Sequence, residues 1–256
     1  MQNLTVAVVQ QEIVPNNPQQ NLATFSRALK DLKNCDLIAL PEVFTTGFCA
    51  NARNFAEHVD GTAYSWMADH AKQLDAVITG SLVVKEGDTY FNRMVWMRPD
   101  GTYTHYDKRH LFRMGGEHTR YQCGTERIIV ELNGWRILPL VCYDLRFPVW
   151  SRNRNDYDLS IYVANWPSAR ALHWNRLLQA RAIENQAYVV GVNRVGMDEV
   201  HQHYVGDSAI YGPAGEVIVH SQEPGSFYAE LYGDKLLEYR QKFPAHMDAD
   251  DFELRF

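Results

Sequence analysis

The chain has 256 residues, 46% of them hydrophobic and 22% charged, a balance that can fill one large hydrophobic core. A formal net charge of −6, with no basic run or aromatic-interleaved basic stripe, argues against nucleic acid or an anionic membrane as the main partner. No apolar run approaches the ~18 residues of a membrane span, and the N-terminus has no basic and apolar leader, so we expect a single cytoplasmic domain over residues 1–256.

The first half of the chain alternates strands and helices. A β-branched run over residues 4–10 predicts a strand, and apolar residues at three- and four-residue steps over 20–32 predict a helix that packs one face on a sheet. Four further features are predicted in order: a short strand over 36–42, a helix over about 64–73, a strand over 76–84 and a hairpin turning at 98–101.

The second half repeats this order of elements. The predicted segments are a strand over 135–141, a short helix over 148–155, a strand over 158–167, a helix over 169–186, a strand over 187–195 and a hairpin turning at 212–215. Two such units could pack their sheets face to face in a four-layer αββα sandwich, an α/β fold. The periodicity alone leaves a single doubly wound sheet open as an alternative.

Three polar residues stand at the ends of predicted strands. Cys142 ends the apolar run of 135–141, Glu42 ends the strand of 36–42, and Lys108 follows the first hairpin. A carboxylate beside a thiol can take its proton and leave the nucleophilic thiolate. Taken singly, each residue has a simpler explanation, because a free cysteine is usually a small buried hydrophobe and isolated charges are usually capping or solvated groups. The four cysteines are scattered without a CxxC pair, which predicts reduced thiols: Cys35, Cys49, Cys123 and Cys142.

The segments around these residues resemble the nitrilase superfamily of carbon–nitrogen hydrolases. They occur in the order typical of that family, and the resemblance extends along most of the chain. The segments are Leu-Pro-Glu-Val-Phe-Thr-Thr-Gly-Phe at 40–48, Tyr-Asp-Lys-Arg-His-Leu-Phe at 106–112, Cys-Tyr-Asp-Leu-Arg-Phe-Pro at 142–148 and Arg-Ala-Ile-Glu-Asn at 181–185. The αββα sandwich suggested by the repeat is also the fold of that family.

The resemblance implies a Glu-Lys-Cys triad and no cofactor. Cys142 would attack an amide carbonyl and hold the acyl group as a thioester, while Glu42 would take the thiol proton and later activate water. Lys108 and the backbone N–H of Tyr143 would stabilise the oxyanion, and Glu117 would hold the lysine or the substrate in place. A small-molecule amide is then the expected partner, and a homodimer the expected assembly.

Other polar patterns favour structural roles. The pair His201 and His203 has metal-ligand spacing, but surface or core histidines are the better interpretation, and we expect no metal site. Arg181 and Glu184 are expected to form a structural ion pair. The tail over 248–251 lacks the glycine and spacing of a calcium loop, and no glycine-rich phosphate loop supports a nucleotide cofactor.

Within the family the segments look most like those of the ω-amidases, which hydrolyse the terminal amide of 2-oxoglutaramate or 2-oxosuccinamate. Alternatives are a deaminated-glutathione amidase, an N-carbamoyl hydrolase, a true nitrilase or a non-catalytic binding relative. A substrate with a distal carboxylate needs a cation in the pocket, for which arginine has the matching planar geometry. Arg113, Arg146 and Arg170 lie near the motif segments and are candidates, although for any single one a structural or surface charge is the better interpretation.

Overall fold

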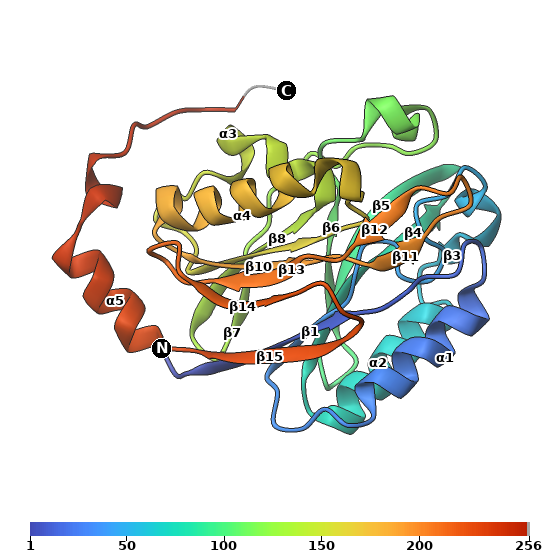
Figure 1. Ribbon diagram of the computed structural model, residues 1–256, viewed down its shortest axis with the longest axis horizontal. Helices are drawn as coiled ribbons and strands as arrows, with labels where there is room; N and C mark the ends of the chain where they lie inside the picture. Colours follow the sequence, from blue (N-terminus) through green and yellow to red (C-terminus); the bar gives the residue numbers. More distant parts are fainter. Residues whose placement is uncertain (255–256) are drawn as a thin grey trace.

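Two mixed β-sheets lie face to face in the computed structural model, which describes residues 1–254, and helices cover the outer side of each sheet (Figure 1). This arrangement confirms the αββα sandwich and excludes the single doubly wound sheet. No helix within the described residues has the length and apolar character needed to cross a bilayer.

The first sheet has the strand order β15-β1-β2-β4-β5-β6, with β3 paired to β4. Its strands are β1 (Leu4–Gln10), β2 (Leu37–Ala39), β3 (Glu57–His58), β4 (Val77–Glu86), β5 (Thr89–Met97), β6 (Tyr103–Asp107) and β15 (Gly225–Leu231). Strands β1, β2 and β4 run parallel, which places their carboxyl ends at one edge. Helices α1 (Pro18–Leu29) and α2 (Thr62–Leu74) pack on its outer face.

The second sheet has the order β14-β13-β10-β9-β8-β7, and its three central strands are also parallel. Its strands are β7 (Val130–Leu132), β8 (Trp135–Val141), β9 (Leu159–Val163), β10 (Tyr188–Val192), β13 (Ser208–Tyr211) and β14 (Val217–Ser221). A separate ribbon pairs β11 (Val195–Met197) with β12 (His203–Val205). The remaining elements are α3 (Pro148–Ser151), α4 (Ala171–Asn185), α5 (Gly233–Lys242), η1 (Ala52–Phe55), η2 (Arg113–Gly115), η3 (Glu117–Thr119), η4 (Cys142–Arg146), η5 (Ser168–Arg170) and η6 (Ala245–Asp248).

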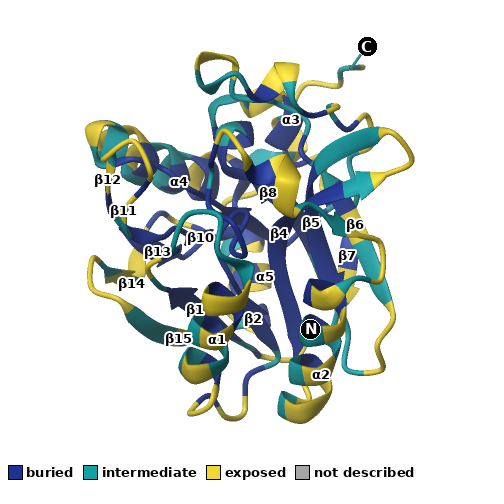
Figure 2. Cartoon of the chain, turned by 90° about the vertical axis from the view of Figure 1, so that its right-hand side faces the viewer, coloured by how far each residue is buried: buried dark blue, intermediate teal, exposed yellow. Residues whose placement is uncertain are grey.

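Strand β1 shows how one apolar run fills two layers of the sandwich. Val6 and Val8 belong to the cluster between the sheets, whereas Ala7 and Val9 pack with α1 and α2 on the outer face. Alternate side chains of a strand point to opposite faces, so a strand that is buried on both faces reads as a continuous apolar run. Figure 2 shows the central strands buried and the exposed residues concentrated in helices and loops.

The predicted order of elements is confirmed, but several boundaries differ. The strand expected over 36–42 pairs only over Leu37–Ala39, because the chain leaves the sheet before Pro41. The segments expected over 148–155 and 158–167 are also shorter, at Pro148–Ser151 and Leu159–Val163. The sequence did not reveal that β15 crosses from the second half to pair with β1, which completes the edge of the first sheet, nor that α5 follows it.

Candidate active site

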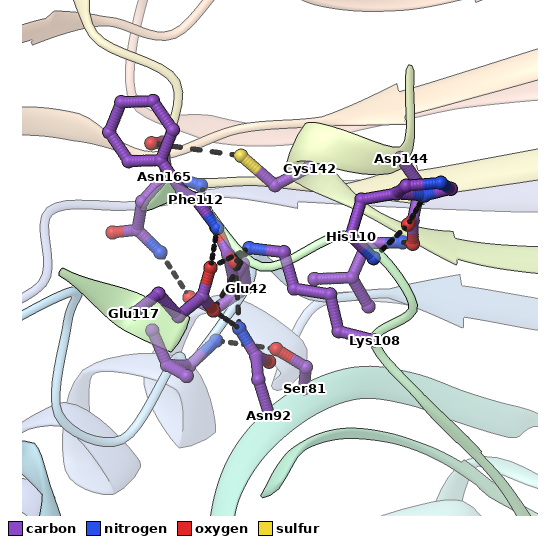
Figure 3. A network of polar contacts seen from close by, with 12 residues as sticks. Glu42, Ser81, Asn92, Lys108, His110, Phe112, Glu117, Cys142, Asp144 and Asn165 are labelled. Carbon is purple, nitrogen blue, oxygen red and sulfur yellow. Dashed lines mark hydrogen bonds and ion pairs between the residues drawn. The ribbon is translucent and has the colours of Figure 1, made fainter. Parts of the chain in front are cut away.

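The two parallel strand sets end at a common pocket of about 280 Å³. Glu42 follows β2 of the first sheet by three residues, and Cys142 follows β8 of the second sheet directly. The crevice beyond the carboxyl ends of parallel strands is the usual ligand position in α/β folds. The sandwich therefore brings together residues that are far apart in the chain, and Figure 3 shows their side chains converging.

Cys142 occupies the sharp turn from β8 into η4. Its backbone has φ 45°, in the left-handed region that residues other than glycine rarely adopt. A carboxylate oxygen of Asp144 accepts the N–H of Val141 at 3.0 Å and closes this turn. The thiol lines the pocket, and its sulfur lies 4.0 Å from the carbonyl oxygen of Asn165. Strained backbone that holds a nucleophile at a strand end is a feature of catalytic turns.

The surroundings of Cys142 favour the neutral form of its thiol. Burial raises the pKa of Cys142 well above its ordinary value, the negative charge of Glu42 raises it further, and Lys108 partly opposes this effect. A neutral thiol is a weak nucleophile, so attack requires a base that takes the proton as the new bond forms. Glu42 lines the same pocket as the sulfur, interacts with it directly and can serve this purpose.

The carboxylate of Glu42 is held by donors from both sheets. Oε1 accepts hydrogen bonds from Lys108 Nζ at 2.8 Å and Asn92 Nδ2 at 2.8 Å, while Oε2 accepts the backbone N–H of Asn165 at 2.8 Å. The amide of Asn165 also donates to the carbonyl oxygen of Glu42. The next residue, Val43, has φ 39°, and its N–H donates to Ser81 Oγ at 2.8 Å. Together these contacts fix the orientation of the Glu42 carboxylate.

Lys108 is fully buried between two carboxylates. Its Nζ lies 2.8 Å from Glu42 Oε1 and 3.0 and 2.9 Å from the two oxygens of Glu117. Burial opposes its charge, but the negative charges of Glu117 and Glu42 outweigh burial and raise the pKa of Lys108 well above its ordinary value. Glu117 also accepts the N–H of Phe112 at 2.6 Å. The ammonium is therefore a fixed positive charge beside the pocket.

Asp144 connects the lysine segment to the cysteine turn. One of its oxygens accepts the hydroxyl of Tyr106 at 2.9 Å, and the other lies 3.0 Å from the backbone nitrogen and 2.8 Å from Nδ1 of His110. Tyr106 and His110 flank Lys108 in the chain, so this buried carboxylate joins the segment of Lys108 to the turn of Cys142. Burial and the charge of Asp144 raise the pKa of Tyr106 well above its ordinary value, which keeps its hydroxyl a donor.

Aromatic and cationic side chains form the walls of the pocket. Three arginines line it, Arg120, Arg146 and Arg170, whereas Arg113 is exposed on η2 and does not. The guanidinium of Arg146 lies 4.8 Å from the ring of Trp166, and that of Arg170 lies 5.4 Å from the ring of Phe112. The full lining is Glu42, Phe48, Ala50, Lys108, Phe112, Met114, Gly115, Arg120, Cys142, Tyr143, Arg146, Asn165, Trp166, Pro167, Arg170, Asp198, Glu199, Val200, Gln202 and Tyr204.

The structure brings together all five residues singled out in the sequence. Glu42, Lys108, Cys142 and Tyr143 line the pocket, and Glu117 lies behind Lys108. Sequence reasoning missed Asn92, Asn165, Asp144, Arg120 and the segment over 198–204. An asparagine in the middle of an apolar strand is an unusual choice and could have identified Asn92. Asp144 lies within the motif segment at 142–148, and the others carry no local signal.

The residues considered for structural roles lie elsewhere. Arg181 and Glu184 form the expected ion pair at 2.8 Å. His201 and His203 are exposed near the β11–β12 ribbon. Within residues 1–254 no group of three or more histidine, cysteine, aspartate or glutamate side chains is arranged to hold a metal ion.

The chain is similar to several known proteins. A family model described as carbon–nitrogen hydrolase matches residues 5–236. The chain is 50% identical to an omega-amidase YafV from Escherichia coli (strain K12) over 256 residues, which covers 99% of this chain and 100% of that relative. It is 32% identical over 251 residues to a 2-oxoglutaramate amidase from Bacillus subtilis (strain 168), covering 95% of this chain and 96% of the relative.

A solved structure matches as well. The crystal structure of a carbon–nitrogen hydrolase superfamily protein from Xanthomonas campestris, which carries an arsenic adduct in its active site, is 44% identical to this chain. The two structures superpose with a TM-score of 0.98, and the match covers 100% of both chains. The similarity therefore includes the positions of both sheets and of the loops between them.

Proposed function

We propose, from the premise that this chain belongs to the carbon–nitrogen hydrolase family of the nitrilase superfamily, that it is an ω-amidase. The family resemblance expected from the motif segments is confirmed, and it makes the chain an amidase that hydrolyses carbon–nitrogen bonds other than peptide bonds. The proposed substrates are short dicarboxylic acid monoamides such as 2-oxoglutaramate and 2-oxosuccinamate. The products are the dicarboxylate and ammonia.

The proposed reaction has two halves. In the first, the sulfur of Cys142 bonds to the amide carbon while Glu42 takes the thiol proton and passes it to the departing nitrogen. Ammonia is released, and the acyl group remains on Cys142 as a thioester. In the second, Glu42 takes a proton from water, and the hydroxyl adds to the thioester carbon. The carbon–sulfur bond then breaks as Glu42 returns the proton to the sulfur, which restores the thiol. Lys108 and the backbone N–H of Tyr143 stabilise both oxyanions, and one such donor is typically worth about 3 to 4 kcal/mol. Glu117 holds Lys108.

The observation that carries the substrate assignment is the presence of arginines without acidic partners in the same pocket as Cys142. Within residues 1–254, neither Arg146 nor Arg170 forms an ion pair with a carboxylate, whereas several other arginines do. Both guanidinium groups are held against aromatic rings, which limits the conformations that each can adopt. A small anion is therefore the ligand that completes the pocket. A volume of about 280 Å³ suits a substrate of this length.

The test compares kcat/KM for substrates with and without the distal carboxylate. 2-Oxoglutaramate and succinamate are expected to exceed butyramide, a simple nitrile and an N-carbamoyl amine. Arg146→Ala and Arg170→Ala should each lower kcat/KM for 2-oxoglutaramate about ten- to two-hundredfold, because each loses a charge-assisted contact. The same variants should leave butyramide hydrolysis unchanged.

Arg113→Ala is the matched control, since this arginine is exposed outside the pocket and its loss should change neither substrate. Preference for the nitrile or the carbamoyl compound, or equal rates with and without the carboxylate, would disprove the ω-amidase assignment. The proposed mechanism through Cys142 would still stand in that case, but the acyl group of the substrate would be a different one.

We further propose that residues 1–256 form one catalytic domain that acts as a cytoplasmic homodimer. A core shared by both sheets supports the single domain. Leu172 and Ile183 are exposed on the same side of α4 and support an interface there. Sedimentation or light scattering measures the assembly, and fractionation of cells measures the location.

A further inference from the structure

Asn92 is an uncharged residue in contact with three charged residues of the site. It lies in β5 and is fully buried. Its Nδ2 lies 2.8 Å from Glu42 Oε1 and 3.0 Å from Glu117 Oε1, and Figure 3 shows it beneath both carboxylates. Its backbone carbonyl accepts the N–H of Lys108 at 2.9 Å. One residue thus contacts the proposed base, the proposed oxyanion donor and the carboxylate that holds this donor.

The charges that Asn92 bridges are unbalanced. Glu42 and Glu117 share a single ammonium, that of Lys108. Two carboxylates in one buried site normally lead one of them to bind a proton. Glu42 must be ionised to take the proton of Cys142. The amide of Asn92 has two N–H donors and no charge, so it can stabilise both carboxylates without changing the net charge of the site.

The N–H donors of Lys108 provide a second reason for the contacts of Asn92 with both carboxylates. An ammonium has three N–H donors, and Lys108 has three contacts at rest, one with Glu42 and two with Glu117. It has to release one of these contacts when it donates to an oxyanion. Glu42 Oε1 and Glu117 Oε1 are the two oxygens that Asn92 also contacts. Either oxygen therefore keeps a donor when Lys108 turns toward the substrate.

The orientation of the amide follows from its neighbours. The opposite orientation would place Oδ1 against two carboxylate oxygens, so the nitrogen must face them. This leaves Oδ1 of Asn92 buried, with no hydrogen-bond partner within the described residues. The contacts with Glu42 and Glu117 therefore determine how the amide is turned.

We infer that Asn92 is a positioning residue that keeps Glu42 and Glu117 ionised side by side and allows Lys108 to donate to the oxyanion. The inference rests on the proposed function, because it takes the roles of Glu42, Lys108 and Cys142 from there. Further ionisable groups that interact with this cluster are the thiol of Cys142 and the hydroxyl of Tyr121, whose pKa is raised by burial and by the charge of Glu117.

The experiment compares Asn92→Ala and Asn92→Asp with the unmodified enzyme. Asn92→Ala should lower kcat about 10- to 100-fold, as expected for a lost hydrogen bond to a charged group, with KM changed by less than about twofold. The acid limb of the kcat/KM profile should move to higher pH by about one unit, because a carboxylate that loses donors is protonated more readily. Asn92→Asp adds a third negative charge to the cluster in a side chain of unchanged shape, so it should move the limb further in the same direction.

Thr79→Val is the matched control. Thr79 is a buried polar residue in β4 of the same sheet, and its hydroxyl donates to the carbonyl oxygen of Val95 at 2.8 Å without touching the carboxylates. The Thr79→Val variant should lose some stability, and the acid limb of its kcat/KM profile should stay at the pH of the unmodified enzyme. If Asn92→Ala keeps the unmodified acid limb, or matches Thr79→Val in kcat, the inference is wrong. If Asn92→Ala does not fold, the inference is equally wrong when folded Asn92→Asp has its acid limb at the same pH as the unmodified enzyme.

A second readout separates this inference from the substrate assignment. Alkylation of Cys142 by iodoacetamide, followed across pH by peptide mass spectrometry, needs no amide substrate. Its acid limb should move to higher pH in both Asn92 variants, by the amount seen in kcat/KM. If no ω-monoamide is hydrolysed and this limb still moves, the proposed substrate fails while the role of Asn92 stands. If the limb does not move, the role of Asn92 fails whatever the substrate.

Discussion

The turn after β2 and the turn after β8 each end a parallel strand with a residue in the left-handed region, Val43 at φ 39° and Cys142 at φ 45°. The two turns then differ in how they treat their polar group. The carboxylate of Glu42 accepts hydrogen bonds from three N–H donors, whereas the sulfur of Cys142 lies 4.0 Å from a carbonyl oxygen and also interacts with the carboxylate of Glu42. The first turn fixes its polar group with several donors, and the second leaves its reactive atom facing the pocket.

The difference follows from the state of each group at rest. A buried carboxylate is ionised only if fixed donors replace its lost hydration, so the turn of Glu42 needs partners from both sheets. A buried thiol is neutral and tolerates an apolar environment, and it must be accessible to the substrate. The turn of Cys142 is therefore held through its backbone and Asp144, which leaves the sulfur accessible to the pocket.

The largest effect is expected from removing the sulfur. Cys142→Ala should abolish amide turnover, because no other group in the pocket can form the thioester, and should shift the melting temperature by only a few degrees since the side chains differ by one atom. Initial rates and thermal unfolding measure both. Cys123→Ala, a change at a half-buried thiol outside the pocket, should leave the rate unchanged. Activity retained in Cys142→Ala would refute the nucleophile assignment.

Replacing the base tests the other turn. Glu42→Gln should lower kcat about 10²- to 10⁴-fold, the range typical for loss of a general base. Burial still raises the pKa of Cys142, so its alkylation should increase with pH up to alkaline values rather than level off near neutrality. A variant with nearly normal turnover would show that a different group accepts the proton.

Glu117→Gln should have a smaller effect with a distinctive pH dependence. Lys108 keeps Glu42 as its partner, so we expect a loss of about 10- to 100-fold in kcat. After burial, which opposes its charge, Glu117 is the strongest influence that raises the pKa of Lys108. Its removal lowers this pKa, so Lys108 loses its charge at a lower pH. The alkaline limb of the activity profile should therefore move to lower pH. An alkaline limb at the unmodified position would contradict the proposed role of Lys108.

Asp144→Asn tests the connection between the two turns. The substitution keeps the shape of the side chain but weakens its hydrogen bonds to Tyr106, His110 and Val141. We expect a loss of about tenfold in kcat, together with a destabilisation of about 1 to 3 kcal/mol by urea unfolding. If stability falls and kcat does not, Asp144 supports the fold without setting the geometry of the pocket.

The smallest effect is expected from chelation. Lys108 and the backbone N–H of Tyr143 are proposed to supply the charge that a zinc ion would otherwise provide to the oxyanion. Dialysis against a strong chelator should therefore leave kcat and KM unchanged. Activity lost on chelation and restored by zinc would return attention to His201 and His203.

The sequence alone determined most of the order of elements and the proposed catalytic residues. Periodicity is a property of neighbouring residues, so the strand at 135–141 and the helix at 169–186 could be predicted without any tertiary information. The motif segments likewise place Glu42, Lys108 and Cys142 each in a short local context. Five of the residues that meet at the site could be named in this way.

Tertiary structure alone decided how these residues are held. The contact between Asn92 and Glu42 joins positions 50 residues apart, and that between Asn165 and Glu42 joins positions 123 apart. The pairing of β15 with β1 joins opposite ends of the chain. No local pattern encodes such contacts, because they arise when two apolar sheet faces pack together and bring the ends of their strands to one edge.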